Sequence, residues 1–243
     1  MAIKEGIIKQ ARRLVLLLVD LLWPLECLNC GCEGRGLCSD CRAKIAYLPW
    51  QSCLVCGQVG DGRICRHHQL PLDGLLAAVS YHDELIKKMV WFCKYRLVKS
   101  LADDLAELLI AAWQQNFVLP TPAKFNSEAP PLVLGVPLAR RRRNWRGFNQ
   151  AALIAEQLAI GRGWPFNNRD LRKIKHTRPQ VALDGEARRK NLEGCFVWRG
   201  GDLAGRTIIL VDDVATTGST LNECAKVLKQ AGAKKVWGAV VAR

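Results

Sequence analysis

Two adjacent carboxylates followed by a hydroxyl-rich turn are the residues of this chain best suited to chemistry. Asp212 and Asp213 follow the branched apolar run 208–211, which predicts a strand buried on both faces. In the turn, Gly218 allows a ligand to approach the backbone closely, and the N–H groups that open the next helix favour an anion. The predicted phosphate-binding residues are Ala215, Thr216, Thr217, Gly218, Ser219 and Thr220.

The two acids indicate which kind of phosphate compound could bind. Carboxylates beside the turn would repel bare phosphate, so we expect Asp212 and Asp213 to accept hydrogen bonds from sugar hydroxyls or to hold Mg²⁺ through water. The pattern therefore predicts a sugar phosphate with Mg²⁺. No Lys follows Gly218, which departs from a Walker A loop. The alternative is a plain strand, turn and helix in which both acids only form the turn.

Two basic segments could meet the negative charge of such a ligand. The first is expected to be a loop, and it follows a predicted strand at 132–137 that ends in Pro137. Its guanidinium groups can pair bidentately with phosphate, and its aromatic rings can stack on a base. Its candidate residues are Arg140, Arg141, Arg142, Arg143, Trp145, Arg146, Asn149 and Gln150. The second segment, 175–191, is polar and basic, and Pro179 excludes a continuous helix there.

Arginine runs more often mark a solvated surface, but the position of the first segment after a strand end favours a site. Lys94 and Arg96, by contrast, stand at the end of a predicted helix. They could reach a phosphate, and we prefer to interpret them as solvated charges.

The cysteines are placed as metal ligands. Eight of the eleven lie between Cys27 and Cys65, mostly in C-x-x-C pairs, and two such pairs can close the shell of a structural zinc ion. The first predicted site is Cys27, Cys30, Cys38 and Cys41, and the weaker second site is Cys53, Cys56, Cys65 and His68. His67 could take the ligand role of His68, and Cys32 is a thiol that the first site does not need. A cross-brace, in which alternate pairs bind the same ion, remains an alternative.

Composition limits the kind of partner that we expect, and the N-terminal segment limits how the chain could meet a membrane. The net charge is +14, which favours polyanionic partners such as nucleic acid, anionic lipid or phosphorylated metabolites. The basic and then apolar residues before position 24 lack a small-residue cleavage site and form a run too short to span a bilayer. We expect an amphipathic helix at 7–22 that packs on the protein or rests on a membrane surface, and not an integral membrane protein.

Periodicity predicts the elements that must position these groups. Strands are expected at 75–81, 132–137 and 208–211, and helices at 83–94, 100–115, 151–160 and from 221 onwards. The proline-containing segment 117–131 is expected to be a linker or surface insertion. We predict three parts: an N-terminal helix (1–23), a cysteine-rich module (24–70) and an α/β domain (71–243).

The order of these motifs resembles the ComF family of competence proteins, and the stretch around Asp212 resembles the signature of type I phosphoribosyltransferases. The motifs are the cysteine module, K-Y-R at 94–96, R-G-F-N-Q at 146–150, T-x-x-Q at 177–180 and V-D-D-V-x-T-T-G-S-T at 211–220. The resemblance implies a parallel sheet flanked by helices behind a zinc finger of double zinc-ribbon type. It also implies a role in natural transformation, at the cytoplasmic side of the inner membrane.

The resemblance further implies roles for single residues. Asp212 and Asp213 would contact the ribose of phosphoribosyl pyrophosphate, and the turn would hold its 5′-phosphate. Pro137 would lie where the pyrophosphate binds with Mg²⁺. The loop residues Arg143, Arg146, Asn149 and Gln150 would be mobile, and Gln180, Arg188 and Asn191 would complete the site. His68, where the family has a cysteine, is a departure that bears on the second zinc ion.

Three functions are compatible with this pattern. The first is a DNA-uptake factor that binds phosphoribosyl pyrophosphate, with single-stranded DNA as partner and a competence helicase and an inner-membrane channel as candidate protein partners. The second is a nucleotide-salvage phosphoribosyltransferase, the class to which any catalysis would belong. The third is a zinc-dependent nucleic-acid-binding module with a vestigial pocket. We prefer the first.

Overall fold

The computed structural model describes residues 25–115, 129–175 and 191–243. The chain divides into two compact units, Met1–Ile45 and Ala46–Arg243. This division falls within the range predicted for the cysteine module, so the second set of cysteines belongs to the larger unit. The expected N-terminal helix, most of the expected linker, Gln180 and Arg188 lie outside the described residues.

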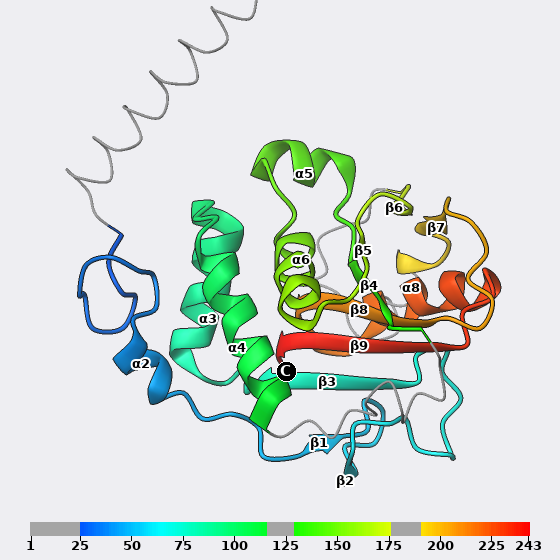
Figure 1. Ribbon diagram of the computed structural model, residues 1–243, viewed down its shortest axis with the longest axis horizontal. Coiled ribbons are helices and arrows are strands. Elements are labelled where there is room, and N and C mark those ends of the chain that lie inside the picture. The colour runs from blue at the N-terminus through cyan, green and yellow to red at the C-terminus, as the bar shows by residue number, and fades with distance from the viewer. Residues whose placement is uncertain (1–24, 116–128, 176–190) are drawn as a thin grey trace, which may run out of the picture. The chain divides into compact units, whose positions relative to one another are not determined.

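A five-stranded parallel sheet forms the centre of the larger unit. Its order is β3-β9-β8-β4-β5, and all four neighbouring pairs are parallel (Figure 1). The strands are β3 (Gly74–Val79), β4 (Leu132–Gly135), β5 (Phe166–Asn167), β8 (Thr207–Val214) and β9 (Lys235–Ala242). Most of their residues are buried, as expected for strands covered on both faces. The predicted α/β architecture is confirmed, and β8 extends through both acids.

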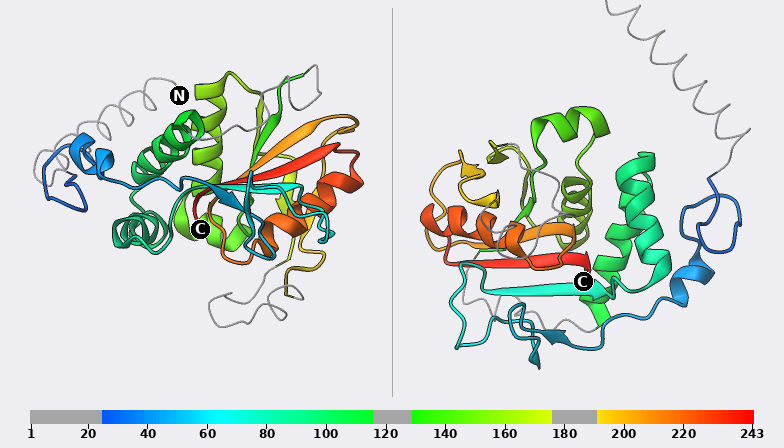
Figure 2. Two further views of the ribbon diagram at one scale, coloured as in Figure 1. Left: turned by 90° about the horizontal axis from the view of Figure 1, so that it is seen from below. Right: turned by 180° about the vertical axis from the view of Figure 1, so that it is seen from behind.

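Helices cover both faces of this sheet. On one face, α4 (Leu101–Gln115) packs on β3 and β9, and α6 (Gln150–Arg162) packs on β4 and β8. The second face carries α8 (Ser219–Gln230), which packs on β8 and β9 (Figure 2). A short antiparallel ribbon of β6 (Leu171–Lys173) and β7 (Phe196–Trp198) lies against α8. At Gly135 an added Cβ would come within 2.5 Å of the Ala152 Cα, so only glycine allows β4 and α6 this close.

Two segments differ from the sequence expectation. The predicted helix 83–94 is α3 (Glu84–Trp91), followed by the π-helical turn η1 (Phe92–Arg96), which ends at Leu97 with φ 61°. The basic segment after Pro137 is not a loop, because Arg140–Arg146 forms helix α5. Arginine is a good helix former, and the left-handed Gly147 (φ 78°) ends the helix.

The remaining described elements belong to the cysteine segments. The smaller unit contains α2 (Ser39–Ala43), and the larger contains a short antiparallel pair, β1 (Gln51–Ser52) and β2 (Val59–Gly60). Among the described residues, no helix combines the length and the apolar character that crossing a membrane requires.

Because the sheet is parallel, its carboxyl ends meet at one edge. The helix α3 follows β3 there, α5 follows β4, and the hydroxyl-rich turn follows β8 (Figure 1). Ligands of open α/β sheets bind at this edge. The fold therefore brings three of the sequence motifs to the same place.

Candidate functional site

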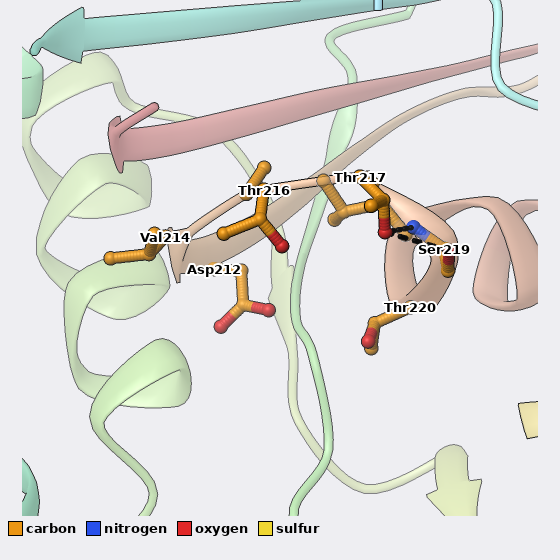
Figure 3. Close-up of a pocket in the computed structure, with 9 residues that line it drawn as sticks. Asp212, Val214, Thr216, Thr217, Ser219 and Thr220 are labelled. Atoms are coloured by element: carbon orange, nitrogen blue, oxygen red, sulfur yellow. Dashed lines mark hydrogen bonds between the residues drawn. The ribbon is translucent and has the colours of Figure 1, made fainter. Parts of the chain in front are cut away.

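A polar pocket lies at the carboxyl end of β8. It is lined by Asp212 and by residues 214–221, which form the turn and the first residues of α8 (Figure 3). Gly218 has φ 66° and stands at the N-cap of α8, so the turn presents its N–H groups at a helix N-terminus. The hydroxyls of Thr217 and Ser219 lie 2.8 Å apart and hold the turn in shape. This arrangement suits a phosphate group.

The two acids do not share this pocket. Successive residues of a strand point to opposite faces of the sheet, and β8 remains extended through both carboxylates. In Figure 3, Asp212 extends to the same side of the turn as Thr220. Asp212 lines the pocket together with the first residues of α8, which places it on the α8 side of the sheet. Asp213 is only 4% exposed and contacts residues of the opposite face.

Asp212 is an unusual acid because it is poorly solvated. Burial and the negative charge of Asp213 raise its pKa to about 8. The backbone N–H of Asp213 donates to Asp212 Oδ1 at 2.9 Å, which partly opposes that rise. Without a ligand, much of Asp212 is therefore protonated at neutral pH. A cation or a donor hydroxyl placed in the pocket would favour its ionised form.

Lys94 is the counter-ion of Asp213. Its Nζ lies 2.8 Å from Asp213 Oδ2, and its side chain is 24% exposed. Burial opposes the positive charge of Lys94, but Asp213 outweighs burial, and the pKa of Lys94 is raised. The expectation that Lys94 is a solvated charge is therefore wrong. The π-helical turn adds one residue to a helical turn and directs Lys94 inward.

The R-G-F-N-Q motif continues this network. Gln150 Nε2 donates to Asp213 Oδ2 at 3.2 Å, and Arg146 donates to Gln150 Oε1 at 2.6 Å. Arg146 is buried, and its guanidinium carbon lies 6.0 Å from the centre of the Tyr95 ring. Asn149 donates to the carbonyl oxygen of Val136, next to Pro137. The motif thus joins β4, α5 and η1 to the second acid.

The structure separates the remaining candidates. The residues 140–143 and Trp145 are exposed on α5, whereas Arg146 and Gln150 are buried. Asn191 is partly buried and follows the segment that the structure does not describe. Lys94 was missed as a site residue, although it follows Met89, Val90 and Cys93 on the apolar side of its helix.

The two cysteine sets repeat one local structure. In each, the backbone N–H of a glycine with positive φ donates a hydrogen bond to the carbonyl oxygen of the first cysteine, four residues earlier. The N–O distances are 2.9 Å for Gly31 and Cys27 and 3.0 Å for Gly57 and Cys53. Burial raises the pKa of these two cysteines, but backbone N–H donors outweigh it and lower each to about 6. Both are therefore thiolates near neutral pH, the form that binds zinc.

The ligand atoms gather within consecutive pairs. The sulfur atoms of Cys27, Cys30, Cys38 and Cys41 all lie within 4.8 Å of one another, and so do the ligand atoms of Cys53, Cys56 and His68. Cys65 Sγ is 3.6 Å from Cys56 Sγ, but Cys65 is not one of the three residues whose ligand atoms gather in the second set. This grouping is not a cross-brace. Each set could hold a metal ion, and sulfur and imidazole ligands in this number suit zinc.

The second set touches the phosphate turn. Leu54, between Cys53 and Cys56, packs so closely on Gly218 that a Cβ there would come within 2.2 Å of Leu54 Cδ2. Arg243, which follows β9, donates to the Ser52 carbonyl at 3.1 Å and to the Cys53 carbonyl at 3.4 Å. The segment that carries the second cysteine set therefore packs against the turn. Sequence spacing carries no signal for a contact of this kind.

Comparison with known proteins identifies the family. Competence protein F of Haemophilus influenzae is 31% identical over 228 residues, which is 88% of this chain and 95% of that protein. The chain belongs to the ComF family. DNA utilization protein YhgH of Salmonella typhimurium is 29% identical over 83% of the chain and 94% of its own length. Competence protein ComFC of Bacillus subtilis is 28% identical over 81% of the chain and 79% of its own length.

A family model adds the domain type. Residues 151–243 match the phosphoribosyl transferase domain, which agrees with the parallel sheet and the β8–α8 turn. The resemblance to the ComF family seen in the sequence and the phosphoribosyltransferase-like fold are both confirmed. The ComF chain is therefore one of a competence and DNA-utilisation family that carries this domain.

The Lys94–Asp213 ion pair yields a stability prediction. We expect Lys94→Met to lower the free energy of unfolding by about 3 kcal/mol, because it leaves the buried Asp213 carboxylate without a counter-ion. The measurement is urea denaturation at neutral pH. Lys87→Met is the matched control, because Lys87 on α3 pairs with Glu84 at 2.7 Å where Glu84 is 85% exposed. Such a surface pair should contribute at most about 1 kcal/mol. Equal losses in the two variants would contradict the assignment.

The second metal set yields another prediction. We expect wild-type protein to contain two zinc ions per chain by elemental analysis, and Cys53→Ser to contain one. Because Leu54 then loses its fixed position, amide hydrogen exchange at Gly218 and Ser219 should become faster in Cys53→Ser. Cys32→Ser is the control, and it should keep both ions and the slow exchange. Unchanged exchange in a Cys53→Ser protein that has lost one zinc ion would show that the metal does not support the turn.

Proposed function

We propose that this protein is a DNA-uptake factor whose β8–α8 turn binds phosphoribosyl pyrophosphate, or a related sugar phosphate, with Mg²⁺. One observation carries the proposal: a poorly solvated carboxylate, Asp212, faces the same pocket as a hydroxyl-rich helix N-terminus. The turn offers N–H and hydroxyl donors to a phosphate, and Asp212 offers an acceptor to a sugar hydroxyl. Neither part alone would select a sugar phosphate.

The two acids have different roles in this proposal. Asp212 contacts the ribose or water bound to Mg²⁺, whose preference for oxygen ligands fits this carboxylate and the neighbouring hydroxyls. Asp213 is a positioning residue, because Lys94 and Gln150 already occupy its Oδ2. It holds η1 and the first residue of α6 at the end of β8. This division replaces the simpler expectation that both acids contact the ribose.

The DNA part of the proposal rests on family and charge. The relatives are named as competence and DNA utilization proteins, and this chain carries a net charge of +14 with four exposed arginines in succession on α5. Such a surface would attract a polyanion. We place the protein on the cytoplasmic side of the inner membrane, with a competence helicase and a membrane channel as its candidate protein partners.

Phosphoribosyl transfer is the second candidate function, and the same carboxylate favours it. Positive charge would develop on the ribose as pyrophosphate departs, and a fixed negative charge in a poorly solvated site would stabilise it. Mg²⁺ would supply charge neutralisation to the leaving group. Transfer predicts pyrophosphate release with an acceptor, whereas ligand sensing predicts binding without turnover.

Calorimetry with phosphoribosyl pyrophosphate and Mg²⁺, with and without single-stranded DNA, tests the sugar-phosphate site. We expect Asp212→Asn to weaken binding about tenfold or more, because it removes a charged acceptor. Since ligand binding favours ionised Asp212, wild-type affinity should rise between about pH 7 and about pH 9, above the phosphate pKa of about 6. Asp212→Asn should lose that rise.

Glu156→Gln, an exposed acid on α6, is the charge-matched control and should behave as wild type. Binding by Asp212→Asn with wild-type affinity and pH dependence would refute the role of this carboxylate. Absence of any binding by wild-type protein would refute the sugar-phosphate proposal altogether.

A further inference from the structure

The outer side of the π-helical turn carries exposed aromatic rings. Trp91 is 47% exposed and Tyr95 is 51% exposed, and the centres of their rings lie 6.0 Å apart. The guanidinium of the exposed Arg96 lies 5.7 Å from the centre of the Trp91 ring. Large aromatic side chains usually have most of their surface buried. Two neighbouring exposed rings beside a cation therefore indicate a surface that binds a partner.

The backbone at this place is strained in a way that favours function. η1 is a π-helical turn, and Leu97 after it has φ 61°, the one non-glycine residue with positive φ in the part of the chain that the structure describes. Turns of this type occur often at functional sites, and a left-handed leucine costs free energy that other contacts must offset. The turn directs Lys94 inward to Asp213 and leaves Tyr95 and Arg96 outside.

Arg146 links this aromatic face to the basic helix. Its guanidinium carbon lies 6.0 Å from the centre of the Tyr95 ring, and the exposed face of α5 begins beside it. On α5, Trp145 is 58% exposed, and the residues 140–143 are four exposed arginines. The helices α3 and α5 follow the carboxyl ends of the strands β3 and β4 (Figure 1). Arg146 thus links two groups of exposed rings and guanidinium groups, which we call together the aromatic-basic face: Trp91, Tyr95, Arg96, residues 140–143 and Trp145.

The chemistry of this face selects its partner. Guanidinium groups recognise phosphates, and exposed rings recognise flat groups that can stack on them. A single-stranded nucleic acid offers both along one chain, whereas a duplex keeps its bases stacked inside. We propose that the aromatic-basic face binds single-stranded nucleic acid by stacking bases on Trp91 and Tyr95 while the arginines of α5 hold the phosphates. The proposal rests on the proposed role in DNA uptake and names the surface that performs it.

The same turn connects this face to Asp213, the residue next to Asp212 of the sugar-phosphate pocket. Tyr95 and Lys94 are adjacent in η1, Lys94 pairs with Asp213, and Gln150 donates to the same carboxylate. The nucleic-acid surface and Asp213 thus lie on opposite sides of one helical turn. This connection gives the molecule a route by which single-stranded DNA could change the affinity for a sugar phosphate.

Fluorescence anisotropy with a labelled oligothymidine tests the stacking contacts. We expect the double variant Trp91→Ala/Tyr95→Ala to bind about tenfold more weakly or worse, because it loses two base-stacking contacts. Trp91→Phe/Tyr95→Phe should keep most of the affinity. Trp50→Ala is the matched control, because Trp50 is 63% exposed but lies outside this face, and it should bind as wild type. Thermal unfolding confirms that each variant is folded.

An abasic strand of the same length separates stacking from charge. It keeps every phosphate but offers no base, so the loss caused by Trp91→Ala/Tyr95→Ala should disappear on it. Replacement of the four arginines at 140–143 by Gln should weaken binding to both strands and reduce the salt dependence. Equal losses on the two strands in the aromatic variant would overturn the stacking assignment.

The outcomes also distinguish this inference from the proposed function. If wild-type protein does not bind the oligonucleotide, the DNA part of the proposed function fails. If wild-type protein binds but Trp91→Ala/Tyr95→Ala and Trp50→Ala are alike, only the aromatic-basic face is refuted. If the aromatic variant loses affinity for vesicles rich in phosphatidylserine and not for DNA, the face belongs to a membrane surface and the inference is overturned.

Discussion

Burying the carboxylate of Asp213 is the constraint on which this molecule depends. A carboxylate removed from water costs several kcal/mol unless a counter-ion and hydrogen-bond donors compensate it. Lys94 and Gln150 supply both, at 2.8 and 3.2 Å. The π-helical turn η1 contains this lysine and directs it inward to the carboxylate. One buried charge on β8 thus holds together η1, through Lys94, and the start of α6, through Gln150.

Much of the architecture could be predicted from the sequence, because strands such as 208–211 are unbroken branched apolar runs and helices such as 100–115 repeat with a period near four. The position of the turn between β8 and α8 followed for the same reason. The roles within the acidic pair could not be predicted. Alternation along β8 places Asp212 and Asp213 on opposite faces, but only the packing of η1 and α6 shows which acid is neutralised.

The basic segment shows a second limit of sequence reasoning. A run of arginines is compatible with a loop or a helix, and the left-handed Gly147 could end either. Arg146 is buried next to exposed neighbours and lies near Tyr95, about fifty residues earlier in the chain. Likewise, the contact between Leu54 and Gly218 joins the second cysteine set to the turn across more than a hundred and fifty residues. Long-range contacts of this kind leave no local periodicity.

The order of the strands has a consequence for biosynthesis. β9 lies between β3 and β8, so the segment Lys235–Ala242 is the piece that unites an early strand with the strand that carries the acids. Until it has been translated, the edges of β3 and β8 remain unpaired, and exposed strand edges favour aggregation. The cysteine pairs emerge from the ribosome long before β9. Metal binding could therefore stabilise the early part of the chain before β9 joins β3 to the rest of the sheet.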